Sequence, residues 1–529
     1  MNPTNIPSAQ ARLPGSLPPA LIGRAQTCLE NAVTFALDTQ HANGSWAERP
    51  EARILDTATV TYALSSTPAG ASACTRARVW LEQALPQCHD EFTAAADHWL
   101  RLLASSPTPP PLPILPRADG PHARRALLLD GIGVSAGSAG ADAQRLLHST
   151  TTALSPDRGR SLKSWQRTML LALEIIARQT LRLPIPAMTL EALESEQGDD
   201  GRFHGMPLLT AVAYLALTQT VPGRASTRRS LSSLLADQQA DGTWRFPTFD
   251  VWDTSLMVRF LRGHPTFHKY ACTRALAFLE RTQSADGGWG CTSAFVGSTA
   301  LASDNDTTGS VLLALANTPH GHRAWPAAAA YARTRQNAAG LWTTWQSSDD
   351  TPVPDVVAHM IAGIHSHDAH AVDTGPASDW LRAAYRQQGR WTADWYTFPS
   401  YAVTEIAPVA GWQAPESLDA VQRLLDAQNP NGSWPRIHGQ DHSSPAATGL
   451  AVSALAASGA DAHSHSHAIE KAVRYLLDSQ DTNGTWIDEQ PFMYGPRPFL
   501  AAVPVQAHAM ACRGIHDLLK PRQGTSPER

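Results

Sequence analysis

Two aspartates stand one residue apart in the segment ALASDNDTTGSVLLALA, residues 300–316, just ahead of Gly309 and an apolar run. Because the segment reads as buried, desolvation and a neighbouring charge would both raise the free energy of an ionised carboxylate there. Asp306 beside Asp304 could therefore keep its proton near neutral pH and act as a general acid. The structural alternative is that one of the two carboxylates caps the helix that follows, and the pair can serve both purposes.

A phrase that recurs along the chain indicates which elements position these residues. Six copies fit the pattern Q-x-x-x-G-x-W, a seventh has Phe for Trp, and Gly389-Arg390-Trp391 resembles an incomplete eighth copy. The aromatic residues of the first seven are Trp46, Phe203, Trp244, Trp289, Trp342, Trp434 and Trp486. Adjacent copies lie roughly 40 to 55 residues apart, a spacing typical of a supersecondary repeat.

Each copy lies between two apolar stretches of helical spacing, so one repeat is predicted to be helix, turn, helix. The glycine suits the left-handed backbone at a helix end, and the Gln and Trp side chains can join one helix end to the next. Sustained two-residue alternation, the signal of a strand, is absent from the sequence. The pattern therefore predicts an all-α fold in which most of these tryptophans are core residues.

Composition indicates a globular protein of two or more domains. The 529 residues, 43% of them hydrophobic, can bury a large core, and the net charge of −5 argues against a nucleic-acid partner. The six cysteines form no CxxC pair, which favours the cytoplasm. No stretch approaches the roughly 20 apolar residues of a membrane span, and the N-terminus lacks the features of a signal peptide, so no stable membrane insertion is expected.

The repeated phrase resembles the QW motifs of the class II terpene cyclases and squalene-hopene cyclases. Five other segments resemble motifs of the same family, G-S-F-x-x-S-P-x-x-T-A, V-W-D-T-A, D-x-D-D-T, D-V-T-A-[H/N] and W-H-x-S-P-x-Y. The matching segments of this sequence, given in the order of those motifs, are residues 201–211 (GRFHGMPLLTA), 249–255 (FDVWDTS), 304–308 (DNDTT), 355–359 (DVVAH) and 395–401 (WYTFPSY). Together they span most of residues 30–500.

The resemblance implies two α/α barrels, usually called β and γ, with γ inserted after a short N-terminal piece of β. It would place that N-terminal segment at residues 1–19, γ at residues 20–249, and the β barrel with the catalytic acid at residues 250–529. The active-site cavity would lie between the two barrels.

The resemblance also implies roles for single residues. Asp306 matches the proton donor of the family, with Asp304 beside it, and His359 matches the residue that bonds this acid and helps to reprotonate it. The residues alone favour a core histidine bonded to a backbone carbonyl, and the resemblance reverses that interpretation. The side chains expected to contact the substrate are Trp252, Asp253, Trp289, Thr307, Trp342, Trp395, Tyr401 and Tyr494.

One departure from the family pattern bears on the substrate. Thr307 stands at the fourth position of the acidic motif, where the family pattern has aspartate, and the resulting D-x-D-T-T resembles the motif of bacterial drimenyl diphosphate synthases. This implies that the terminal alkene of farnesyl diphosphate is protonated and cyclised to drimenyl diphosphate, with the diphosphate retained, as in sesquiterpene biosynthesis. The alternative is a diterpene cyclase that converts geranylgeranyl diphosphate to a copalyl-type diphosphate, because chain length is set by cavity depth.

The family resemblance also implies a Mg²⁺ ion that binds the diphosphate. Cyclases that expel the diphosphate use DDxxD and NSE motifs, and the sequence contains neither. The acidic stretch with Glu191, Glu194 and Asp199 lies where the resemblance would put a Mg²⁺ site, and a solvated helix face is the alternative. The expected partner is thus a small-molecule prenyl diphosphate; the sequence leaves the oligomeric state open, with a homodimer as one option.

Two other classes of protein share single features of this sequence. Asp304 and Asp306 also fit the D-x-D-x-T segment of haloacid-dehalogenase phosphatases, in which the first aspartate is a nucleophile, but that fold needs a β-strand directly before the motif and an α/β sheet. A non-catalytic helical toroid, such as a prenyltransferase subunit, would share the barrel and would lack the D-x-D segment.

Overall fold

A computed structural model describes most of the chain: residues 17–48, 50–84, 91–113, 121–156, 162, 164–246, 248–293, 303–345, 351–393, 395–436, 442–458, 462–488, 493–495 and 499–520. These residues are mainly helical. Their only sheets are two antiparallel pairs of short strands, β1 (Trp434–Pro435) with β2 (Ser443–Ser444) and β3 (Met493–Gly495) with β4 (Phe499–Ala501). The predicted all-α fold is confirmed, and it excludes the α/β phosphatase.

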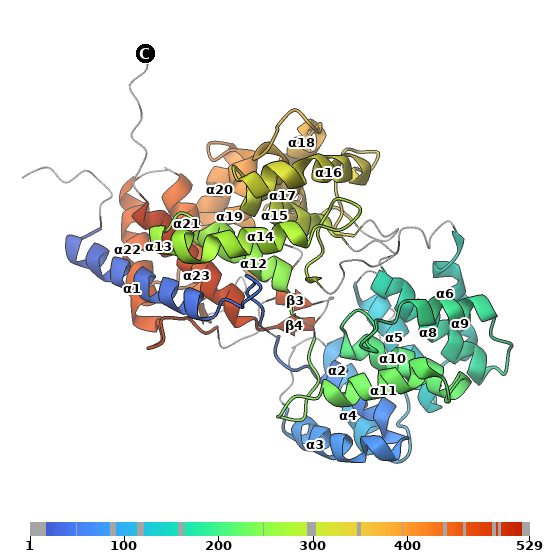
Figure 1. The fold of residues 1–529 in the computed structure, drawn as a ribbon. Helices are drawn as coiled ribbons and strands as arrows, with labels where there is room; N and C mark the ends of the chain where they lie inside the picture. The colour runs from blue at the N-terminus through green and yellow to red at the C-terminus, as the bar shows by residue number, and fades with distance from the viewer. Residues whose placement is uncertain are drawn as a thin grey trace, which may run out of the picture.

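The helices gather in two lobes (Figure 1). The first lobe contains the helices α2 (Ile54–Ser65), α3 (Ala71–Gln83), α4 (Glu91–Ser105), α5 (Pro121–Ala136), α6 (Ala143–Ala153), α8 (Ser164–Thr180), α9 (Ala187–Ser195), α10 (Pro207–Thr220) and α11 (Ala225–Ala236), with the short η1 (Pro68–Gly70). Within it α4 packs on α2, α2 on α10, α10 on α8, and α8 on α5.

The second lobe contains α1 and the helices of the C-terminal half. They are α1 (Pro19–Asp38), α12 (Asp250–Leu261), α13 (Pro265–Phe267), the π-helical η2 (His268–Cys272), α14 (Thr273–Arg281), α15 (Asn305–Leu315), α16 (Pro319–Arg335), α17 (Pro354–His365), α18 (Gly375–Gln388), α19 (Pro399–Ala410), α20 (Pro415–Asp426), α21 (Pro445–Ser458), α22 (Ala462–Ser479) and α23 (Pro504–Leu519). None of the helices in the described part of the chain has a stretch long and apolar enough to cross a membrane.

Six helices of the second lobe form a closed inner ring. In order around the ring, α12 packs on α15, α15 on α17, α17 on α19, α19 on α21, α21 on α23, and α23 packs back on α12. Such helices must be apolar on most sides because they touch neighbours all round. The sequence of α21, PAATGLAVSALAAS, meets this requirement with small residues that are buried along nearly its whole length.

The outer helices are joined by the repeated phrase. The indole N–H of each Trp in the pattern donates to a backbone carbonyl ten residues earlier, as Trp289 does to Leu279 at 2.7 Å. The side-chain amide of Gln283 donates to Gly287 at 2.8 Å and, across to α16, to the Ala324 carbonyl at 3.0 Å. A Cβ at Gly287, whose φ is +90°, would lie 2.3 Å from a backbone oxygen. The predicted role of Gln and Trp in joining helix ends is thus confirmed.

Helix α1 belongs to the second lobe, contrary to the predicted boundary at residue 20. It packs on α22, α23 and α13, and the amide of Gln480 at the end of α22 donates to the Cys28 carbonyl of α1 at 2.9 Å. Gln40 at its other end donates to the Ala271 carbonyl at 3.1 Å, so α1 closes the outer ring between α22 and η2. Residues 1–16 lie outside the described part, and the rest of the predicted division into β and γ stays a prediction.

Candidate active site

The aspartate pair lies at the start of α15, where Asp304 is the N-cap. Its Oδ1 accepts a hydrogen bond from the Thr307 backbone N–H at 2.6 Å, and its Oδ2 accepts one from the Thr307 hydroxyl at 3.0 Å. The backbone N–H of Asp304 donates to the Trp289 carbonyl at 2.9 Å. The capping interpretation therefore holds for Asp304, with Thr307 as its partner, and Asp306 lies free of that role in the first turn of the helix.

Asp306 pairs with His359 of the neighbouring inner helix α17. Asp306 Oδ1 lies 2.6 Å from His359 Nδ1, and the two residues are 4% and 0% exposed. The helices can approach this closely because Gly309 lies at their crossing: a Cβ there would lie 2.5 Å from the carbonyl carbon of His359. The structure thus brings together the acid and the histidine that the sequence analysis singled out.

The far nitrogen of His359 faces a third inner helix. His359 Nε2 lies 2.8 Å from Oε2 of Glu405 on α19. Glu405 in turn forms ion pairs with Arg259 of α12 and Arg513 of α23, one through each carboxylate oxygen. Burial alone would raise the pKa of Glu405, but the charges of the two arginines and of His359 hold that pKa well below its ordinary value. Glu405 is therefore an ionised carboxylate in the core of the ring.

These charges set the protonation of His359. Burial disfavours an imidazolium, but the charges of ionised Asp306 and of Glu405 outweigh it and raise the pKa of His359 to about 9; while Asp306 holds a proton, Glu405 supports the imidazolium. At neutral pH both ring nitrogens consequently carry hydrogen, with Nδ1 donating to Asp306 and Nε2 donating to Glu405. Because Asp306 Oδ1 accepts the hydrogen bond from Nδ1, a proton held by Asp306 must sit on Oδ2.

Aromatic rings lie around the histidine. The ring centroids of Trp252 and Tyr401 are 5.9 Å and 6.2 Å from that of His359, and Tyr396 is 4.3 Å from Tyr401. The Trp252 indole N–H donates to the Tyr396 hydroxyl at 2.6 Å. Burial raises the pKa of both tyrosines well above the ordinary value, so the phenols stay neutral. Neutral electron-rich rings can stabilise a cation held between them.

Asp253 connects to this aromatic group through a glutamine. The Tyr396 hydroxyl donates to the side-chain oxygen of Gln506 at 2.8 Å, and the Gln506 amide donates to Asp253 Oδ1 at 2.7 Å. Burial raises the pKa of Asp253 well above its ordinary value, with Asp250 and Glu48 adding to the effect and the Gln506 hydrogen bond opposing it. Trp252 and Asp253, adjacent on α12, thus lie on one hydrogen-bonded path.

The other predicted substrate contacts divide into three groups. Trp289 and Trp342 are fully buried and make the repeat contact to the preceding helix, Trp342 through the Ala332 carbonyl at 3.0 Å. Trp395 is half-buried in an edge-to-face contact with Trp345, 5.0 Å between centroids. The side chain of Tyr494 lies outside the described part, although its backbone pairs with β4. A binding role for each of these residues stays a prediction.

Trp345 also connects the lobes. Its ring contacts Trp165 of α8 in the first lobe edge-to-face, with centroids 5.5 Å apart. The backbone carbonyl of the preceding residue, Thr344, accepts a hydrogen bond from the Asn305 N–H at 3.0 Å, next to Asp306 in the chain. The row formed by Trp395, Trp345 and Trp165 therefore extends from the neighbourhood of the acid to the first lobe.

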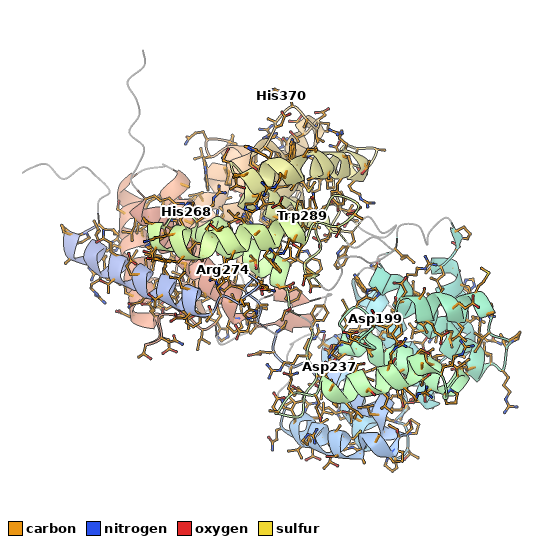
Figure 2. The ribbon with its side chains drawn as sticks, viewed as in Figure 1. Asp199, Asp237, His268, Arg274, Trp289 and His370 are labelled. Carbon is orange, nitrogen blue, oxygen red and sulfur yellow. The ribbon has the colours of Figure 1, made fainter. Side chains whose placement is uncertain are left out.

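The three residues predicted to bind Mg²⁺ do not form a metal site. Glu194 forms an ion pair with Arg224 at 2.6 Å and accepts a hydrogen bond from the Ser226 hydroxyl at 2.6 Å, while Glu191 and Asp199 are exposed. Figure 2 shows Asp199 on the first lobe and Trp289 on the second. Nowhere in the described ranges do three His, Cys, Asp or Glu side chains group as metal ligands. The set does not fit the ion, because an arginine already neutralises its central member.

Three of the charged residues were not predicted from the sequence: Glu405, Arg259 and Arg513. Each is a charge within a largely apolar helix, as in PSYAVTEIAPVA for Glu405. Charged side chains are rarely buried unless they are paired, so Glu405, the lone charge of its apolar helix, signals a buried partner; the helices of Arg259 and Arg513 carry other charges and give a weaker signal. That signal was available in the sequence, although it does not identify the partner.

Comparison with known proteins agrees with the all-α fold. Residues 346–503 match the family Squalene-hopene cyclase C-terminal domain. The chain is 27% identical to the drimenyl diphosphate synthase of Streptantibioticus cattleyicolor over 335 residues, 59% of this chain and 61% of that protein. It is 27% identical to the copalyl diphosphate synthase of Streptomyces anulatus over 186 residues, 32% of this chain and 33% of that protein. The matched part is thus less than two thirds of either relative.

A solved structure shares the fold over nearly the whole chain. The ent-copalyl diphosphate synthase from Streptomyces platensis superposes with a TM-score of 0.55 at 16% identity, covering 94% of this chain and 99% of that one. Residues 346–503 thus belong to the squalene-hopene cyclase C-terminal domain family, and the chain is similar to class II terpene cyclases in sequence and in fold.

Proposed function

We propose that the protein protonates the terminal alkene of a prenyl diphosphate and cyclises the chain while the diphosphate is retained. The observation that carries this proposal is the buried hydrogen bond of 2.6 Å between Asp306 and His359. An alkene is a very weak base, so its protonation needs a strong neutral acid in a site shielded from water.

The contacts of Asp306 suit that step. The hydrogen bond from His359 to Oδ1 leaves the transferable proton on Oδ2 and stabilises the carboxylate that remains after the proton has gone. The new cation would lie near the faces of Trp252, Tyr396 and Tyr401, whose rings compensate its charge without offering a base. Restoring the proton through His359 would ready the acid for the next turnover.

Farnesyl diphosphate is the proposed substrate, with drimenyl diphosphate as the product. The D-x-D-T-T segment supports this choice, as does the relative named drimenyl diphosphate synthase. The relatives named copalyl diphosphate synthase favour geranylgeranyl diphosphate as the alternative. Parallel incubation with both diphosphates, followed by dephosphorylation and mass analysis, separates them. A bicyclic C15 alcohol supports the proposal, a C20 product supports the alternative, and linear alcohols from both would contradict the function.

Magnesium is a separate proposal, because a divalent ion can hold a diphosphate with only one or two protein carboxylates. On that basis EDTA should raise KM for farnesyl diphosphate about tenfold and leave kcat nearly unchanged. Added Mg²⁺ should restore KM, and a KM indifferent to chelation would discard the ion.

A further inference from the structure

We propose that Glu405 is a positioning residue that keeps both ring nitrogens of His359 as hydrogen-bond donors and thereby fixes which oxygen of Asp306 holds the transferable proton. The inference deepens the proposed function and rests on it. It assigns a role to a side chain that does not touch Asp306 and acts on it only through the imidazole ring.

The geometry is a chain of contacts across five inner helices. Asp306 Oδ1 on α15 meets His359 Nδ1 at 2.6 Å, and His359 Nε2 on α17 meets Glu405 Oε2 on α19 at 2.8 Å. Beyond Glu405 lie Arg259 of α12 and Arg513 of α23. The groups that face His359 or its partners are therefore these four charged residues and the phenols of Tyr396 and Tyr401.

The arginines fix Glu405 as well as neutralise it. Arg259 also donates to the Ser310 hydroxyl at 3.0 Å, and both guanidinium groups lie over the Phe260 ring, Arg259 at 5.3 Å and Arg513 at 4.6 Å from its centroid. The ion pairs with Arg259 and Arg513 hold the Glu405 carboxylate in its ionised form and keep it oriented toward His359. Its oxygen consequently accepts the Nε2 hydrogen at all times near neutral pH.

The consequence at Asp306 follows from which atoms donate. If His359 lost the hydrogen on Nδ1, that nitrogen would become an acceptor, and the proton of Asp306 would be held between the two residues instead of pointing at a substrate. The negative charge of Glu405, 2.8 Å from Nε2, stabilises the doubly protonated imidazolium, in which Nδ1 is also a donor, and so disfavours this arrangement. Arg259, Arg513, imidazolium His359 and ionised Glu405 together carry a net positive charge, and the negative charge that Asp306 gains when it donates its proton offsets part of it, which favours transfer.

The test is Glu405→Gln, read out in two ways. Histidine ¹⁵N NMR of the full chain, with the His359 signal assigned by its loss in His359→Ala, follows ring protonation without any substrate. We expect His359 to titrate near pH 9 in the wild-type protein and at least one pH unit lower in Glu405→Gln. With farnesyl diphosphate, kcat should fall roughly 100-fold while KM changes less than about threefold.

Two further variants control for packing and charge. Glu405→Asp keeps the charge, so it should retain the high titration of His359 even though its rate is reduced. Glu174→Gln removes a matched buried glutamate, 6% exposed and paired with Arg178 at 2.7 Å in the first lobe, and should alter neither readout. An unchanged His359 titration together with an unchanged kcat in Glu405→Gln overturns the proposal.

A loss of activity in Glu405→Gln could also come from misfolding, because removing the Glu405 charge leaves two buried arginines without their partner. The double variant Glu405→Gln, Arg513→Gln removes one charge of each sign, and its folding is checked by circular dichroism. It should show the same drop in His359 titration, and a wild-type titration in this variant would overturn the proposal. If the wild-type protein cyclises neither diphosphate, the proposed function fails while the NMR comparison still decides the role of Glu405.

Discussion

The two lobes join their helices in the same way. In the first lobe the Trp244 indole donates to the Leu234 carbonyl at 2.7 Å, and in the second the Trp434 indole donates to the Leu424 carbonyl at 2.6 Å. The contact is local to one helix and its following turn, and it recurs wherever the phrase occurs in the described sequence. It therefore explains the architecture of both lobes and distinguishes neither as the site of chemistry.

The lobes differ in the charges that their helices bury. The first lobe holds buried ion pairs such as Arg125 with Asp97 at 3.3 Å and Glu174 with Arg178 at 2.7 Å. The second lobe holds an extended array that runs from two arginines through Glu405 and His359 and ends at Asp306. The difference teaches that a common repeat supplies the scaffold of both lobes, whereas the charge array that ends at Asp306, the proposed acid, belongs to the second lobe.

Asp306→Asn should have the largest effect, because it removes the proton donor and keeps the shape of the side chain. Cyclisation should fall by at least about 10⁴-fold, with the circular dichroism spectrum and substrate binding retained. Asp97→Asn in the first lobe is the matched control, and it should lower stability without changing kcat. Full activity in Asp306→Asn would remove the mechanism.

His359→Ala should slow cyclisation by about 10²- to 10³-fold, since Asp306 then loses the hydrogen bond that orients its proton. Steady-state rates with farnesyl diphosphate give the comparison, alongside thermal unfolding to confirm the fold. An unchanged rate would return His359 to the interpretation of an ordinary core residue.

The free energy of unfolding should depend on pH through His359, a residue of the charge array in the second lobe. The pKa of His359 is raised from 6.5 to about 9, so its stabilising effect is complete below pH 6.5 and is lost as the pH rises through about 9. At most this is worth about 3 kcal/mol of unfolding free energy. Urea unfolding of the wild-type and His359→Ala proteins should therefore converge as the pH rises from 6 to about 9.5, and parallel curves would contradict the charged imidazole.

The smallest effects are expected for the repeat itself. Trp244→Phe and Trp434→Phe each remove one indole N–H and leave a buried carbonyl without that donor, at a cost of about 1–2 kcal/mol in either lobe. Denaturant titration measures both, and kcat of the folded enzyme should stay unchanged in each. A rate loss confined to Trp434→Phe would show that the repeat contributes to chemistry as well as to the scaffold.

Local contacts were predictable from sequence because their partners lie close in the chain. The Gln283 and Trp289 contacts follow from one turn and its glycine, and the cap at Asp304 follows from the start of an apolar helix. The predicted membership of residues 20–38 in the first lobe was wrong because no local feature of α1 reports the partner that covers its apolar face.

The site was harder to predict, because its residues meet only through closure of the ring. Asp306 and His359 are 53 positions apart, and only the resemblance to a family joined them. Glu405 and Arg513 are separated by 108 positions, and the lone charge of Glu405 in α19 signalled burial without saying which helices would be neighbours. The ion pair of Glu194, one of the three residues predicted to bind Mg²⁺, could not be predicted for a related reason, since its partner Arg224 caps a separate helix; the Mg²⁺ site itself stays a prediction.

The position of α1 between α22 and η2 affects the order in which the chain can fold. Its hydrogen bond with Gln480 joins residues 452 positions apart, so the first helix to be synthesised waits for almost the last before the outer ring can close. The helices of the first lobe, in contrast, form one continuous stretch of chain and need no such delay. We therefore expect the first lobe to be structured while the ribosome is still making the second, and long-range closure to limit the overall rate of folding.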